Sequence, residues 1–90
     1  MRIGQKVMTR GIADKLADNE KFAKQVTYFM GLYLQGDWGD ISEGDKEMND
    51  ANAQMGTGSL MGAYETCVGR IWIMTEHDRS ATTILFPDEY

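Results

Sequence analysis

The last twenty residues of this 90-residue chain constrain its fold more than any other segment, because they predict two β-strands joined by a tight polar turn. The first strand, residues 70–76, has two isoleucines on one face and a tryptophan and a methionine on the other. Both faces are therefore apolar, which indicates a central strand covered on both sides. Residues 77–80 have the composition of a turn, and Pro87 ends the second strand, residues 81–86.

The preceding residues predict two helices and two further strands. In chain order these are a strand at 7–9, a helix from 13 or 14 to 34, a helix at 43–54 and a strand at 60–65. Ser42 is a suitable N-cap for the second helix, whose weak apolar side would be Met48, Ala51 and Met55. We expect one α+β domain over residues 1–90, in the order β-α-α-β-β-β. Two helices would pack a three- or four-stranded antiparallel sheet.

Composition excludes several classes of protein. The hydrophobic fraction is 42% and the charged fraction 26%, as in ordinary globular domains and unlike disordered chains. No apolar run approaches the roughly 20 residues that cross a bilayer, and the first residues do not form a secretory signal. With one cysteine, Cys67, the chain has neither an internal disulfide nor the ligands of a zinc site. We expect a cytoplasmic protein without a membrane anchor, metal or cofactor.

The net charge of −5 is unevenly distributed along the chain. Residues 1–36 carry a net charge of +3, residues 37–50 carry −5, and residues 51–90 carry −3. A protein that binds nucleic acid directly has a basic surface, and this distribution argues against that function. The acidic segment 37–50 instead indicates either a solvated face or a surface for a basic partner.

The sequence contains a combination of short motifs: Gly36-Asp-Trp-Gly-Asp40, Asp45-Lys46 with Asn49, Ala63-Tyr64, Ile71-Trp-Ile-Met-Thr-Glu76 and residues 78–90. In this combination the chain resembles, over nearly its full length, a family of small bacterial "plasmid-related" proteins carried by plasmids and integrative elements. Some members are labelled type I restriction subunit M, although 90 residues cannot hold a methyltransferase domain. The resemblance implies a mobile genetic element as the source and implies no established activity or catalytic residue.

The turn from Glu76 to Ser80 brings acid, base and nucleophile types together, yet adjacent turn residues rarely point at one another as catalysis requires. His77 also stands where similar proteins have an apolar residue, so we assign no catalytic residue. Arg79 is expected to form a structural ion pair, with Glu76 or with an acid of segment 37–50. Cys67 lies in a predicted turn without a neighbouring base, which indicates an unactivated thiol.

Segment 37–50 is the candidate functional site. Its carboxylates do not follow the alternate spacing of a calcium loop, so we expect no metal there. A dense row of carboxylates can imitate a phosphate backbone and occupy the groove of a nucleic-acid enzyme. Trp38 either anchors the loop onto the domain or contacts a partner. The candidate partner-binding residues are Asp37, Trp38, Asp40, Glu43, Asp45 and Glu47.

The leading hypothesis is a non-enzymatic protein-interaction module of a mobile element that binds a protein with a basic surface. Inhibition of a host defence enzyme that handles nucleic acid is its most concrete form. One alternative is a small-ligand or enzymatic domain with a sheet-side pocket formed by Tyr64, Glu76 and Arg79. Another is a structural domain whose exposed sheet face dimerises, so both a monomer and a homodimer fit the sequence.

Overall fold

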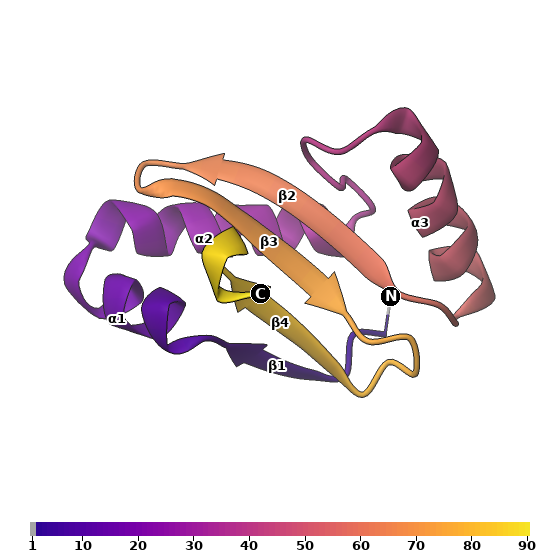
Figure 1. The fold of residues 1–90 in the computed structure, drawn as a ribbon, viewed down its shortest axis with the longest axis horizontal. Coiled ribbons are helices and arrows are strands. Elements are labelled where there is room, and N and C mark those ends of the chain that lie inside the picture. The colour runs from indigo at the N-terminus through magenta and orange to yellow at the C-terminus, as the bar shows by residue number, and fades with distance from the viewer. Residues whose placement is uncertain (1) are drawn as a thin grey trace.

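The computed structural model describes residues 2–90, which form a four-stranded sheet with helices on one face and at one edge (Figure 1). The elements are β1 (Gln5–Met8), α1 (Arg10–Asp18), α2 (Glu20–Leu34), α3 (Glu43–Met55), β2 (Leu60–Thr66), β3 (Gly69–Thr75), β4 (Ala81–Leu85) and a final 3-10 turn, η1 (Pro87–Glu89). The α+β class is confirmed, but the observed order is β-α-α-α-β-β-β.

The strand order in the sheet is β1-β4-β3-β2, so β3 and β4 are central, as expected for the strand with two apolar faces. β2, β3 and β4 are antiparallel neighbours, with Trp72 opposite both Ala63 and Leu85. The prediction of a purely antiparallel sheet is wrong, because β1 pairs with β4 in parallel, from Gln5 beside Ala81 to Met8 beside Ile84. The chain returns to β1, as β4, only after three helices and two strands, and this connection leaves the two strands parallel.

The single helix expected between residues 13 and 34 is two helices, which is a second correction. Asn19 has an extended backbone (φ −136°, ψ 100°), and its side-chain oxygen accepts a hydrogen bond from the Phe22 amide at 2.9 Å. Asparagine is a strong N-cap because it satisfies an amide at the helix start that has no partner within the helix. The interruption at Asn19 therefore turns the chain between α1 and α2 without leaving a buried amide unpaired.

The core lies between α2 and the inner face of the sheet. Phe22 and Tyr33 of α2 are fully buried, as are Ile71 and Ile73 of β3. The Tyr33 hydroxyl lies 2.7 Å from the hydroxyl of Thr75 and forms a hydrogen bond with it. A polar contact inside an apolar core fixes one arrangement of the helix on the sheet.

Three hydroxyl groups form a directed chain through this core. The Thr82 hydroxyl donates to the carbonyl of Ile3 at 2.7 Å, so its oxygen accepts from Thr75, also at 2.7 Å. Thr75 then accepts from Tyr33, because a threonine hydroxyl has a single hydrogen to give. The chain links α2, β3, β4 and the segment that leads into β1.

Candidate functional site

The loop between α2 and α3 is fastened to the outer edge of β2. The Ala63 amide donates to the Trp38 carbonyl at 3.0 Å, and the Asp40 amide donates to the Ala63 carbonyl at 2.8 Å. Gly39 lies between these two bonds at φ 75°, and a Cβ atom there would come within 2.1 Å of the Ala63 oxygen. Only glycine fits this position, so the loop covers part of an edge that would otherwise be free to pair.

Trp38 is part of the core, with 2% of its surface exposed. Its ring packs edge-on against Tyr33 with 5.3 Å between ring centroids, and its indole nitrogen donates to the Asp50 carboxylate at 2.8 Å. A buried indole whose N–H already has a partner is not available to another protein. Trp38 is therefore removed from the candidate partner-binding residues, and its alternative role, as the anchor of the loop, is the one observed.

α3 begins and ends as its sequence predicts. The Ser42 hydroxyl accepts from the Asp45 amide at 3.1 Å, and Gly56 ends the helix in the left-handed conformation, φ 75°. Glu43 and Asp45 lie in the first turn, where their charges stabilise the positive end of the helix dipole. The bounds Glu43–Met55 agree with the predicted 43–54 to within one residue.

The inner side of α3 is polar, which corrects the expectation of an apolar side formed by Met48, Ala51 and Met55. Asn49 is the buried residue of the helix. Its side-chain nitrogen donates to the Met61 carbonyl at 2.7 Å, and its oxygen accepts from the Met61 amide at 3.3 Å. α3 lies beside an edge strand, whose free backbone groups are better satisfied by an amide than by a thioether. Met48 and Met55 are left 64% and 73% exposed.

Arg79, in the turn between β3 and β4, holds the other end of α3. Its guanidinium donates to the carbonyls of Gly58 at 2.6 Å, Asn52 at 2.9 Å and Thr57 at 3.3 Å. The residue is 4% exposed and has a positive φ of 64°. The expected ion pair is wrong, because the guanidinium bonds to carbonyl oxygens at the C-terminal end of a helix, where the dipole also favours a cation.

Five carboxylates of the predicted site remain exposed: Asp37, Asp40, Glu43, Asp45 and Glu47. Three of them, Asp37, Glu43 and Glu47, line one cleft of about 430 Å³ between the loop and α3. Asp45 lies on the opposite side of the helix and lines a separate hollow beside β2. The structure therefore divides the acidic segment between two sides of α3.

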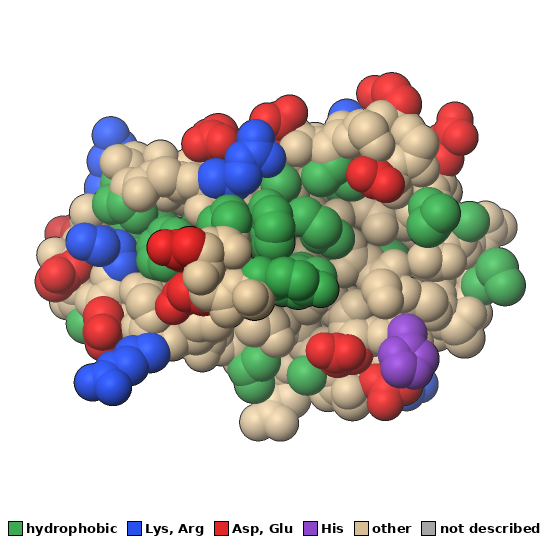
Figure 2. All heavy atoms as spheres, viewed as in Figure 1, with side chains coloured by type: hydrophobic (Ala, Val, Ile, Leu, Met, Phe, Trp, Pro, Cys, Tyr) green, Lys and Arg blue, Asp and Glu red, His purple; other side chains and the backbone are tan. Residues whose placement is uncertain are grey.

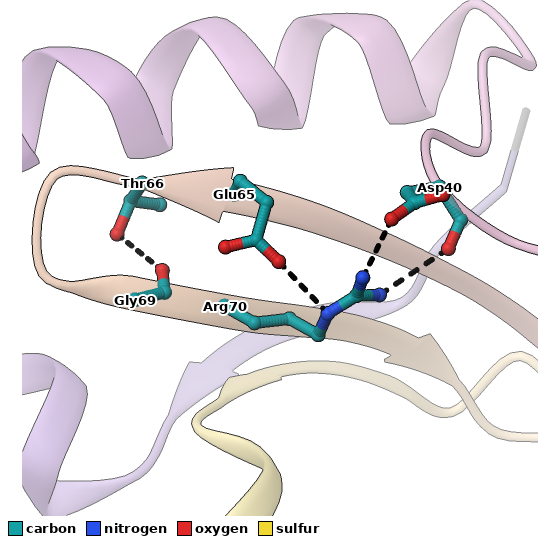
Figure 3. Close-up of polar contacts among 5 residues, drawn as sticks. All are labelled: Asp40, Glu65, Thr66, Gly69 and Arg70. Carbon is teal, nitrogen blue, oxygen red and sulfur yellow. Dashed lines mark hydrogen bonds and ion pairs between the residues drawn. The ribbon is translucent and has the colours of Figure 1, made fainter.

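Asp40 forms an ion pair with Arg70 of β3, which reaches it from a distant part of the chain (Figure 3). One guanidinium nitrogen of Arg70 lies 2.6 Å from Asp40, and another lies 3.0 Å from Glu65 on the neighbouring strand. Glu65 and Arg70 are direct cross-strand partners, which explains why the Arg70 guanidinium lies between Glu65 and the loop. Sequence reasoning missed this role of Arg70. The signal for it was a basic residue at the start of one predicted strand and an acid, Glu65, at the end of the strand before it.

The residues of the alternative pocket do not converge. The Tyr64 hydroxyl donates to the Asp37 carbonyl at 2.7 Å, and Arg79 is engaged by carbonyls at the end of α3. Glu76 is exposed and lines a different hollow, in which neither of the other two takes part. Burial raises the pKa of Tyr64 well above its usual range, so this hydroxyl stays protonated as a structural donor.

Metal binding and reaction of the Cys67 thiol are the other kinds of chemistry that the sequence raises. Among residues 2–90 no three His, Cys, Asp or Glu side chains lie close enough together to hold a metal ion. Cys67 is exposed in the β2–β3 turn, and its amide is bonded to the Gln25 side chain at 2.8 Å. None of the helices described is long and apolar enough to cross a membrane.

Comparison with family models, with curated proteins and with solved structures finds no match to this chain. The function of the protein is therefore inferred from the geometry of loop 37–42 and α3.

Proposed function

We propose that this protein is a non-enzymatic protein-interaction module that binds a partner with a basic surface through loop 37–42 and α3. One observation carries the proposal, namely that the helix buries Asn49 and leaves Met48, Met55 and the carboxylates of Glu43, Asp45 and Glu47 exposed. Burial of Asn49, with Met48 64% exposed, is the reverse of the pattern that a helix adopts when it only completes a core.

The attachment of α3 supports the same function. Three side-chain hydrogen bonds hold the helix in place: Asn49 bonds to Met61, Asp50 to Trp38, and Arg79 to the carbonyl of Asn52. A helix held in this way keeps a fixed position although Met48 and Met55 are not buried in the core. A preorganised surface loses little conformational entropy when a partner binds, and this favours affinity.

Charge determines the class of partner. The cleft between the loop and α3 has four exposed carboxylates, including Asp50, against one lysine, Lys46, which is 3.6 Å from Glu43. Such a surface attracts a basic protein and increases its rate of association at low salt. Enzymes that handle nucleic acid have basic grooves, and the resemblance to plasmid-related proteins supports the proposal that this one serves a mobile element by inhibiting a host defence enzyme in the cytoplasm.

The test is a comparison of two double variants with equal loss of charge. Glu43→Gln with Glu47→Gln removes two carboxylates from the cleft, while Asp14→Asn with Asp18→Asn removes two exposed carboxylates from α1. Affinity capture from a bacterial host lysate identifies the partner, and calorimetry at two salt concentrations then measures affinity for each protein. We expect the cleft variant to bind about three- to tenfold more weakly, with a smaller salt dependence, because exposed charge pairs contribute about 0.2–1 kcal/mol each.

The α1 variant should bind like the wild type. Failure to capture any basic protein, or equal binding by both variants, refutes the proposal. A partner that is a nucleic-acid enzyme should also lose activity in proportion to the bound fraction. An active complex would refute inhibition while leaving the interaction in place.

A further inference from the structure

The face of the sheet opposite α2 is apolar and only partly covered. Side chains alternate along a strand, so burial of Ile71 and Ile73 against α2 directs Trp72 and Met74 to the other face. Met61 pairs with Met74 across β2 and β3 and lies on the same face. Figure 2 shows apolar side chains gathered over the middle of this face, with both acidic and basic side chains around them.

Two adjoining hollows form one groove across this face. The first, about 290 Å³, lies between α3 and β2, and the second, about 370 Å³, continues over β3 and β4 towards the C-terminal turn. Both hollows include Ser59 and Met74, so they adjoin, and together they are called the groove. Their apolar lining includes three methionines, Met48, Met61 and Met74, together with Leu85.

The volumes indicate what the groove holds. Sites for small molecules have about 300–1,000 Å³ and enclose most of their ligand. Here each hollow is at the low end of that range, and Met48 on the rim is 64% exposed, so the groove suits protruding side chains of another protein better than an enclosed ligand. Methionine adapts its shape to varied apolar partners, which is typical of grooves that take up amphipathic helices.

The charges along the groove all have one sign. Asp45, Glu76 and Glu89 line it, and no lysine or arginine does. Asp45 and Glu76 form no ion pair within the described residues 2–90. Glu89 is already engaged, because its carboxylate accepts hydrogen bonds from Thr9 and from two backbone amides. The two unpaired carboxylates, one in each hollow, are complementary to cations beside an apolar stripe.

We propose that this groove binds a basic amphipathic segment of the partner protein, with apolar side chains on the methionines and lysine or arginine at Asp45 and Glu76. This inference rests on the proposed function and extends it, because it gives the partner a second contact on the other side of α3. A second copy of this chain is a poorer occupant, since it carries a net charge of −5 and its amphipathic helix α2 is already packed on its own sheet.

The test uses a synthetic helical peptide of leucine and lysine as the probe, with two control peptides in which glutamate replaces lysine or serine replaces leucine. Calorimetry measures binding to the wild type, to Met48→Lys and to Met55→Lys. Both methionines are exposed on α3, but only Met48 lines the groove. Neither substitution disturbs the core, so circular dichroism and thermal unfolding should match the wild type.

We expect the leucine–lysine peptide to bind and both control peptides to fail. Met48→Lys should weaken binding at least tenfold, because it places a cation on an apolar rim, whereas Met55→Lys should change it less than twofold. Asp45→Asn should weaken binding about threefold.

Four results would overturn the inference. Equal weakening by the two lysine variants shows a general charge effect, and equal binding of the serine peptide shows that the apolar floor is not used. A wild-type dimer in sedimentation equilibrium that Met48→Lys dissociates assigns the groove to a second copy. Binding that is weakened by Glu43→Gln with Glu47→Gln and not by Met48→Lys refutes the groove while supporting the proposed acidic surface.

Discussion

Replacement of Arg79 by alanine should be the most destabilising change outside the apolar core. The side chain is 4% exposed and donates two short hydrogen bonds, at 2.6 and 2.9 Å, to carbonyls at the end of α3. Alanine leaves those carbonyls without a donor and removes a cation from the negative end of the helix dipole. Because the turn between β3 and β4 would then no longer hold α3, the loss should be felt first in that helix.

The magnitude follows from the bonds that are lost. Hydrogen bonds to a charged group contribute about 1.5–3 kcal/mol each, so the two short bonds give a loss of about 3–6 kcal/mol in the free energy of unfolding, neglecting the longer bond to Thr57. A domain of this size is stable by roughly 5–13 kcal/mol, so the variant should remain folded with a much reduced margin. The midpoint of thermal unfolding should fall by at least about 12 °C.

Urea unfolding followed by circular dichroism measures this change, and a glycine variant separates its two causes. Arg79 has φ 64°, a conformation that glycine adopts without strain and alanine does not. Arg79→Gly should therefore lose the same hydrogen bonds and yet be about 1 kcal/mol more stable than Arg79→Ala. Amide exchange should accelerate in α3 before it does in β3. A loss below about 1 kcal/mol in Arg79→Ala would refute the structural role of the guanidinium.

Three further predictions test the core and the C-terminal turn. Thr82→Val interrupts the hydroxyl chain and should reduce the free energy of unfolding by about 1–3 kcal/mol, whereas Thr83→Val on the other face should change it by less than about 0.5 kcal/mol; similar losses in the two would contradict a role for the chain. Burial raises the pKa of Tyr33 from 10.0 to about 12, so its neutral form is favoured in the folded state. Stability should then be constant below pH 10 and fall as the pH rises through 12; the ultraviolet titrations of the wild type and of Tyr33→Phe should differ by a step near 12, and a difference step near 10 would refute burial of the hydroxyl. Hydrogen bonds from Thr9 and from backbone amides lower the pKa of Glu89, so the C-terminal turn should be held above the ordinary glutamate value of 4.5 and released as the pH falls through the lower folded value. The amide shift of Gly11 in NMR spectra should follow that transition and lose its pH dependence in Glu89→Gln; an unchanged profile in the variant would exclude Glu89 as the titrating group.

Local patterns in the sequence were sufficient to predict the C-terminal half of the fold. Alternation and turn composition placed β2, β3 and β4 to within two residues, and the Ser42 cap placed α3. The interruption at Asn19 was missed, because the apolar stripe continues past it and only the capping preference of asparagine marks it. The parallel position of β1 could not be predicted, since it depends on pairing across nearly the whole chain rather than on any local pattern.

The candidate site was predictable in composition and not in geometry. The acidic segment is where the sequence places it, yet Trp38 points inward, Arg70 reaches Asp40 from a distant strand, and the helix divides the carboxylates between two sides. Asn49 and Asn52 both bond to backbone carbonyls on the inner side of α3, and their i, i+3 spacing was the signal that this side is polar. A periodicity search for apolar residues does not detect such a stripe.

The parallel pairing of β1 with β4 also determines the order of events during protein synthesis. Of the four strands described, β1 leaves the ribosome before the others, but within residues 2–90 its strand partner is β4, and Thr9 just beyond it is bonded to Glu89, 80 residues away. At roughly 5–20 residues per second, β1 waits about 4–15 s for that partner to be made. Closing a loop of this length then costs on the order of 4 kcal/mol in chain entropy. The first strand to be translated should therefore be the last to join the sheet.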